Sequence, residues 1–238
     1  MSVWVCVPSA RPVEQVRAWT AAWRERGYKL ALWRDEPWAT IPYPGYAVAV
    51  NRIIAWLIAH VPDAEWFVLG GDDVYPDAAH TAEEIAVECR IHFEDPAAFR
   101  DSWIGTFGVM QPTGDRWGAD ALHMGKRGSA YIDRVCGSAW LGREFCRRVN
   151  QGKGPLWPEY THMGVDEELQ EVAIKYGVLW QRRDLIQMHQ HWGRNPRARV
   201  EDMPEFLKTA NSKPEWDRYK AIIEARRAAG FPGSELLA

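Results

Sequence analysis

The sequence predicts a single α/β domain in which helices flank a mixed, mostly parallel sheet. The 238 residues are 47% hydrophobic and 26% charged, which suits one globular domain with a sizeable core. The first three segments alternate in type: the apolar strand Ser2–Val7, a stretch of helical spacing over Val13–Gly27, and a second strand over Tyr28–Trp33. A helix between two strands predicts a parallel pair, because parallel neighbours need a long crossover.

The later elements are assigned from apolar runs, helical spacing and the positions of glycine and proline. Ala47–His60 is strongly apolar and predicts a helix, and Trp66–Leu69 predicts a buried strand. The remaining expected elements are a helix at 80–93, a strand at 103–110, a polar segment at 111–128, a strand and turn at 129–140, a short helix at 141–150, a loop at 151–161, a helix at 165–176, a strand at 178–187 and a charged helical tail at 203–229.

Composition bounds the class of protein. The net charge of −3 argues against an extended basic surface that binds nucleic acid without sequence preference. The N-terminus shows no signal peptide, and no apolar run reaches the ~20 residues of a membrane-spanning helix, so we expect a soluble, cytoplasmic protein. The cysteines lack CxxC spacing and are expected to be reduced, mostly buried thiols: Cys6, Cys89, Cys136 and Cys146.

The most informative stretch is the end of the predicted strand at 66–69, which runs through Gly70 and Gly71 into Asp72 and Asp73. Ligands of open α/β sheets bind at the carboxyl ends of strands. Two adjacent carboxylates repel each other, so burying them there favours a cation that offsets their charge. Divalent cations bind carboxylate oxygens and bridge to substrate phosphates, which indicates a metal–diphosphate site. The alternative is a polar turn, since glycine and aspartate also favour turns.

Two further motifs lie in the second half of the chain. Asp166-Glu167-Glu168 opens the predicted helix at 165–176, and His189 and His191 follow the last predicted strand. The order of strand, helix, strand, apolar helix, strand with Asp72-Asp73, acidic helix start and late histidines resembles the nucleotide-sugar domain of GT-A fold glycosyltransferases. Their signature is an acidic "DxD" motif at a strand end that binds Mn²⁺ or Mg²⁺ and the diphosphate.

The chain departs from the family pattern at two positions. Gly71 stands where an acid would complete the motif, and Val165 stands where the family often has an acid. The resemblance implies a GT-A type, Rossmann-like fold in one domain over residues 1–238. It assigns 1–100 to the nucleotide-sugar-binding half, 101–200 to the acceptor and catalytic half, and 201–238 to a C-terminal packing helix.

The resemblance also implies residue roles. Asp73 is the first choice for metal ligand, Asp72 contacts the ribose or the metal through water, and His191 or His189 supplies a nitrogen ligand. Asp166 is the expected general base of an inverting transfer, with Glu167 as the fallback. The alternative for both is that they form the favourable acidic first turn of a helix. The residues expected beside the nucleotide or diphosphate are Pro8, Ser9, Arg11, Asp35, Asn51 and Arg52.

The expected donor is a nucleoside-diphosphate sugar, with a UDP-sugar favoured on family grounds, together with Mn²⁺ or Mg²⁺. Small stand-alone enzymes of this kind occur in bacteriophages and modify hydroxymethylated pyrimidines in DNA. DNA is therefore the leading acceptor prediction, which would place the protein in the host cytoplasm. The arginines considered for its phosphates are Arg147-Arg148, Arg182-Arg183 and Arg194–Arg199.

Other acceptors and other classes stay open. A bacterial saccharide or small glycan is the competing acceptor, and aromatic residues around 105–127, Trp140 and 152–163 suit either one. A nucleotidyltransferase is ranked lower, because the loop Pro8–Pro12 lacks the glycines that hold a triphosphate. A non-catalytic module that kept the sugar-nucleotide fold is disfavoured, because the acids expected to bind metal are present.

Overall fold

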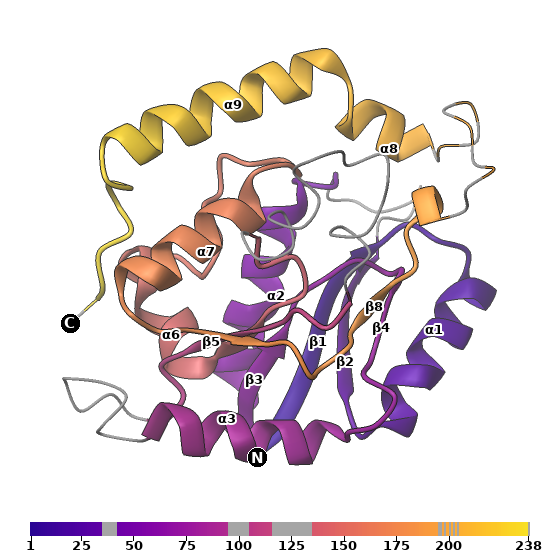
Figure 1. Ribbon diagram of the computed structural model, residues 1–238, viewed down its shortest axis with the longest axis vertical. Coiled ribbons are helices and arrows are strands. Elements are labelled where there is room, and N and C mark those ends of the chain that lie inside the picture. The colour runs from indigo at the N-terminus through magenta and orange to yellow at the C-terminus, as the bar shows by residue number, and fades with distance from the viewer. Residues whose placement is uncertain are drawn as a thin grey trace.

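The computed structural model describes residues 1–34, 42–94, 105–115, 135–194 and 205–237, together with residues 197, 199, 201 and 203. Figure 1 shows a central sheet with helices on both faces. The spatial order of its strands is β2 (Lys29–Arg34), β1 (Ser2–Ser9), β3 (Ala64–Val68), β6 (Trp140–Gly142), β5 (Val109–Pro112) and β7 (Leu179–Arg182). β1 pairs in parallel with β2 and β3, and β5 with β7, whereas β6 is antiparallel to both neighbours. The predicted mixed, mostly parallel α/β sheet is confirmed.

Alternating side chains of the strands supply two separate cores. In β3, Phe67 faces one core, whereas Trp66 and Val68 face the other. The Phe67 core packs against helices α2 (Tyr46–His60), α6 (Arg143–Arg148) and α7 (Val165–Lys175). The Trp66 core packs against α1 (Val13–Glu25) and α3 (Ala82–Glu94). All four cysteines are free and buried in these cores, as expected.

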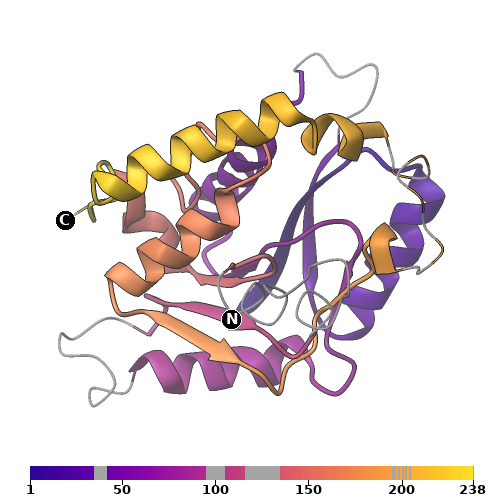
Figure 2. The ribbon, with the colours of Figure 1, turned by 45° about the horizontal axis from the view of Figure 1, so that its top comes forward.

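The C-terminal part of the chain lies over the first of these layers. Helix α8 (Glu205–Ala210) leads into α9 (Lys213–Ala228), which runs along α7 in both views (Figures 1 and 2). Ile223 of α9 joins the core that contains Phe67. A two-stranded ribbon of β4 (Val74–Tyr75) and β8 (Met188–His189) completes the strands of the described chain, and short 3₁₀ turns occur at η3 (Val149–Gly152) and η4 (Trp192–Arg194).

Several element bounds differ from the sequence predictions. β1 continues through Pro8 to Ser9, because these residues still pair with the end of β2. β5 spans Val109–Pro112 and β6 spans Trp140–Gly142, so the described residues 105–108 and 135–139 are not strand, whereas 103–104 and 129–134 of the predicted strands lie outside the described residues. β7 ends at Arg182, where the guanidinium folds back onto Asp184. The predicted tail helix is divided before Lys213, because Pro214 fits only the first turn of a new helix.

No helix in the described ranges is long and apolar enough to cross a membrane.

Candidate active site

The carboxyl ends of β1, β2 and β3 lie at the same edge of the sheet, because the three strands are parallel. α1 follows β1 on one face, whereas α2 precedes β3 on the opposite face. The order of the strands therefore reverses between β1 and β3, and such a topological switch point is where open α/β sheets bind ligands. Most of the predicted site residues that the structure describes lie at this edge.

The turn from β3 into β4 depends on its two glycines. Gly70 has φ of 143°, a backbone conformation that favours glycine. A Cβ on Gly71 would lie 2.4 Å from Oδ1 of Asp73. The Tyr46 hydroxyl exchanges two hydrogen bonds of 3.1 Å with the backbone N–H and C=O of Gly70. The turn is thus held from α2, and it delivers Asp72 and Asp73 to the switch point.

Asp72 is bound by side chains from the end of β1. The Ser9 hydroxyl donates to Oδ2 at 2.5 Å, and Nε of Arg11 donates to Oδ1 at 2.7 Å. Arg34, at the end of β2, donates to the Arg11 carbonyl at 2.7 Å. The Asp72 side chain is only 13% exposed. Ser9, Arg11 and Asp72 therefore lie together at this edge, with Arg11 neutralising Asp72, and their binding of a nucleotide stays a prediction.

Asp73 faces a histidine instead. Its Oδ2 lies 3.3 Å from Nε2 of His189. β4 and β8 fix this approach, because Val74 pairs with His189 and the Gln190 N–H donates to the Asp73 carbonyl. Burial acts to raise the pKa of Asp73, but His189, Arg11 and His191 together lower it below its ordinary value. Asp73 is therefore a stable carboxylate at neutral pH.

Asp115 belongs to the same cluster and was not predicted. It follows the end of β5, and its Oδ2 accepts the His189 backbone N–H at 2.8 Å and an N–H of Arg194. Arg194 also donates to the His189 carbonyl. Its position just beyond a strand was the available signal, but the surrounding glycine-rich sequence was interpreted only as a polar segment. Asp115 fixes the backbone that carries His189.

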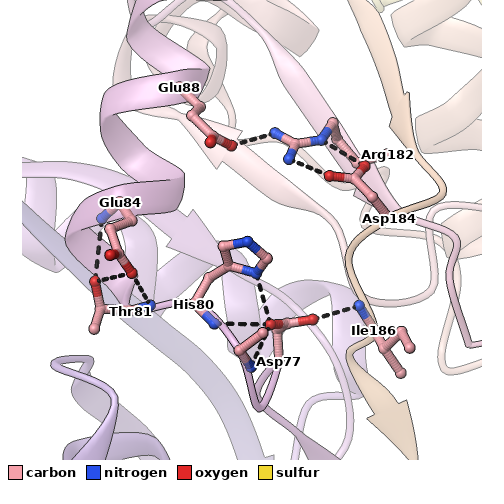
Figure 3. A network of polar contacts seen from close by, with 9 residues as sticks. Asp77, His80, Thr81, Glu84, Glu88, Arg182, Asp184 and Ile186 are labelled. Carbon is pink, nitrogen blue, oxygen red and sulfur yellow. Dashed lines mark hydrogen bonds and ion pairs between the residues drawn. The ribbon is translucent and has the colours of Figure 1, made fainter.

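A second network anchors the segment before β8. Asp77 is 3% exposed and accepts the backbone N–H groups of Ala79 and His80, the His80 ring at 2.8 Å and the Ile186 N–H at 2.7 Å (Figure 3). These bonds overcome the effect of burial and lower the pKa of Asp77. Asp77 therefore has a structural role: it ties the loop after β4 to the segment that leads into β8.

The three acids that open α7 have different partners. Glu168 is 3% exposed, forms a two-pronged ion pair with Arg226 and accepts the Tyr160 hydroxyl at 2.8 Å. Glu167 accepts the Tyr219 hydroxyl at 2.6 Å. Asp166 accepts the backbone N–H of Glu167 at 3.0 Å, and no side chain in the described part of the chain donates a hydrogen bond to it. The C-terminal helix thus holds two of the acids and leaves Asp166 available.

The environment of Asp166 suits a proton acceptor. Burial, followed by the charge of Glu167, raises its pKa to about 6, and His189 opposes this rise. The backbone places it at the sheet edge, because the Cys136 N–H, just before β6, donates to the Asp166 carbonyl at 3.1 Å. His162 lies near Tyr46, with ring centres 6.4 Å apart, and loss of solvation lowers its pKa although the charge of Asp73 acts to raise it.

Other predicted residues are placed differently. Both polar atoms of the Asn51 amide are bound to the Leu156 backbone, at 2.7 and 3.1 Å, so this buried side chain anchors a loop. The Arg52 guanidinium lies 5.7 Å from the Trp33 ring centre. Pro8 is half-buried within β1, and Asp35 lies outside the described residues. Trp140 is fully buried and donates to Gln187, so it belongs to the core rather than to an acceptor surface.

The donor set at Asp73 fits a divalent cation. Its carboxylate and the His189 imidazole are neighbours, and the His191 ring centre lies 5.2 Å from that of His189. In the described part of the chain, no three histidine, cysteine or acidic side chains are already arranged to hold a metal. Such an ion would take its remaining ligands from water and from substrate phosphates, as Mg²⁺ commonly does.

No protein-family profile and no curated protein sequence matches the chain. Similar solved structures include a glycosyltransferase involved in glycosylation of the major capsid of PBCV-1, at 16% identity and a TM-score of 0.36, with 60% of each chain covered. The chain therefore spans less than two thirds of that protein. The catalytic domain of Drosophila β1,4-galactosyltransferase 7 with xylobiose matches at 11% identity and a TM-score of 0.46 over 89% of this chain and 80% of that one. A mutant of that enzyme with manganese, UDP-Gal and xylobiose matches at 11% identity and a TM-score of 0.45, again over 89% of this chain and 80% of that one. Such values carry no assignment of activity to this chain.

Proposed function

We propose that the protein is a metal-dependent glycosyltransferase that moves a sugar from a nucleoside-diphosphate sugar to an acceptor hydroxyl with inversion of configuration. The observation that carries the proposal is the placement of two unlike carboxylates at one sheet edge. The pKa of Asp73 is lowered and that of Asp166 is raised to about 6. When the pKa values of two acids in one site are shifted in opposite directions, the two acids typically have different roles, such as charge stabilisation and proton transfer.

Asp73 and His189 are the proposed metal ligands, with His191 as a further candidate. A divalent cation bound there would supply positive charge to the departing diphosphate. Arg11 is the proposed contact of the diphosphate, which is supported by its partly exposed guanidinium and by its contribution to the lowered pKa of Asp73. Asp72 and Ser9 orient Arg11 through the bonds that they share at the end of β1.

Asp166 is the proposed general base. It accepts the proton of the acceptor hydroxyl while the acceptor oxygen bonds to the anomeric carbon. The bond from that carbon to the phosphate oxygen breaks, and the nucleoside diphosphate leaves with the electron pair. A carboxyl whose pKa is about 6 is ionised at neutral pH and is a stronger base than an ordinary aspartate. Glu167, the predicted fallback, is held by Tyr219, which makes it the weaker candidate.

For the acceptor we rank a saccharide hydroxyl above modified DNA. Three of the arginines considered for DNA phosphates are bound by acids of the chain itself: Arg147 by Glu144, Arg182 by Glu88 and Asp184, and Arg194 by Asp115. The net charge of −3 also disfavours binding to a DNA backbone. The DNA acceptor stays a prediction from the sequence.

The proposal is tested first by thermal denaturation with UDP-sugars, GDP-sugars and nucleoside triphosphates, each with and without Mn²⁺. We expect stabilisation by one nucleoside-diphosphate sugar that depends on Mn²⁺, because only the folded state binds the ligand. A shift with triphosphates alone would instead support a nucleotidyltransferase. The stabilising donor, carrying a radiolabelled sugar, is then incubated with an oligosaccharide panel and with hydroxymethylcytosine DNA. Label in DNA alone would reverse the order of acceptors.

A further inference from the structure

The C-terminal helix holds the side chain of Glu167, the residue that follows Asp166 in the chain and whose backbone N–H donates to the Asp166 carboxylate. The Tyr219 hydroxyl of α9 donates to Oε1 of Glu167 at 2.6 Å, and a guanidinium nitrogen of Arg227 lies 3.7 Å from Oε2. Glu167 is in the first turn of α7, and its side chain is 26% exposed. Without these contacts, a glutamate at such a position would sample rotamers that extend into solvent.

The two contacts have different strengths, and this matters for the test. Arg227 makes its main ion pair with Glu171, one turn further along α7, to which it donates at least two hydrogen bonds. Tyr219 forms its bond to Glu167 alone, and α9 is anchored there by the buried pair of Arg226 with Glu168. Tyr219 is thus the principal group that fixes the Glu167 carboxylate.

The groups that act electrostatically on Asp166 come from several elements. On α7 the neighbouring charge is Glu167, which raises the pKa of Asp166, and on β8 it is His189, which lowers it. In the described part of the chain, its charge also acts on Tyr46 of α2, Cys136 before β6 and Tyr219 of α9. Burial raises the pKa of each of these three, so they are neutral at physiological pH. Glu167 is therefore the negative charge of this set that opposes ionisation of Asp166.

We propose that Glu167 is a positioning residue for the base: Tyr219 holds its carboxylate beside Asp166, so that Asp166 accepts a proton from the acceptor more readily. This inference rests on the proposed function for its meaning in transfer, but its physical content concerns the free protein. α9 is then part of the catalytic apparatus, although it lies outside the sheet edge and touches no reacting atom. The predicted role of residues 201–238 as a packing helix is extended accordingly.

The test is a pH titration of the Asp166 side-chain carboxyl by ¹³C NMR in the full chain without ligands, with the resonance assigned by its loss in Asp166→Asn. Glu167→Gln removes the charge and keeps the shape, and Glu171→Gln is the matched control on the same helix and the same Arg227. We expect the Asp166 titration to move to lower pH in Glu167→Gln and to stay in place in Glu171→Gln. No movement in Glu167→Gln, or equal movement in both, would overturn the proposal.

Tyr219→Phe tests the contribution of α9 separately from the charge of Glu167. It removes only the hydroxyl that holds Glu167, so we expect a shift of the Asp166 titration in the same direction as in Glu167→Gln, but smaller. An unchanged titration would show that α9 has no part in placing Glu167. Thermal denaturation of each variant confirms that the helix remains docked.

Transfer rates then connect the result to the reaction. The transfer rate is measured at pH 5 and at pH 8 with saturating donor and metal. The ratio of the pH 5 rate to the pH 8 rate should be about threefold higher in Glu167→Gln than in the wild type, which corresponds to an acid limb that lies about half a pH unit lower. Glu171→Gln should behave as the wild type. If no donor supports transfer, the proposed function fails while the NMR titration still decides the inference. If transfer occurs and the profile of Glu167→Gln matches that of the wild type, the inference alone fails.

Discussion

The two acidic runs of the protein, Asp72-Asp73 and Asp166 to Glu168, have similar kinds of partners but opposite pKa shifts. In each run, an arginine from another element forms an ion pair with one acid, and a hydroxyl donates a hydrogen bond to an acid: Arg11 and Ser9 in the first, and Arg226 and Tyr219 in the second. One acid in each run is left facing the sheet edge. Asp73 has cationic neighbours and a lowered pKa, whereas Asp166 has a buried site, an anionic neighbour and a raised pKa.

This difference shows that the pKa of an acid in an acidic run is not determined by its neighbours in the sequence alone. Adjacent carboxylates repel each other in both runs, and the outcome depends on which partner arrives from a distant segment. β8 brings His189 to Asp73 through its pairing with β4, whereas α9 brings Tyr219 to Glu167. Among the described residues, no basic side chain forms an ion pair with Asp166. A cation-binding carboxylate and a proton-accepting carboxylate result from the same residue type.

The largest expected effect separates the two acids by function. Asp166→Asn should lower the transfer rate by about 10²–10⁴-fold, because the amide cannot accept the acceptor's proton. Donor binding, measured by Mn²⁺-dependent thermal stabilisation, should stay near the wild-type value. Glu171→Gln, on the same helix, is the control and should keep its activity. Transfer by Asp166→Asn at a rate close to wild type would remove Asp166 from the mechanism.

The next prediction concerns the buried ion pair of the second run, between Arg226 and Glu168. Arg226→Met leaves Glu168, which is 3% exposed, as a buried charge without its partner, and should cost about 3–5 kcal/mol of unfolding free energy. The adjacent Arg227→Met, whose side chain is 45% exposed, should cost only about 0–1 kcal/mol. Urea denaturation of the two variants measures the contrast. Equal losses would mean that burial does not distinguish the two ion pairs.

The first run is tested by Asp73→Asn. Loss of this carboxylate should abolish the Mn²⁺-dependent stabilisation by donor, which for wild type at a hundredfold excess over the dissociation constant amounts to about 2.7 kcal/mol. Asp63→Asn is the control, because Asp63 pairs with Lys29 at the opposite end of β3 and is exposed. Undiminished Mn²⁺-dependent stabilisation in Asp73→Asn would exclude Asp73 as a metal ligand, and the first run would then have no established role in cation binding.

Local patterns predicted much of this architecture, and long-range contacts account for what was missed. The β1–α1–β2 start follows from periodicity, and parallel pairing alone places Ser9 and Asp72 at one edge. The partners of these residues could not be read from the chain. Asn51 was expected at the ligand, but Leu156, 105 positions away, takes both polar atoms of its amide. Asp115 was missed because its role depends on the backbone of His189.

The smallest expected effect is the pH dependence of transfer at saturating donor and metal, where the rate constant reports groups in the substrate complex. A base must be deprotonated to act, so kcat should be constant above the pKa of Asp166, about 6, and fall as pH drops through it. Each unit below should lower kcat about tenfold. Asp73 should add nothing in this window, because its pKa is lowered and it stays ionised. A single acid limb near pH 6 that stays in place when the Mn²⁺ concentration is raised therefore assigns the titration to the second run, because added metal would move a limb caused by protonation of a metal ligand. A flat profile from pH 7 down to pH 5 would show that neither run supplies the base.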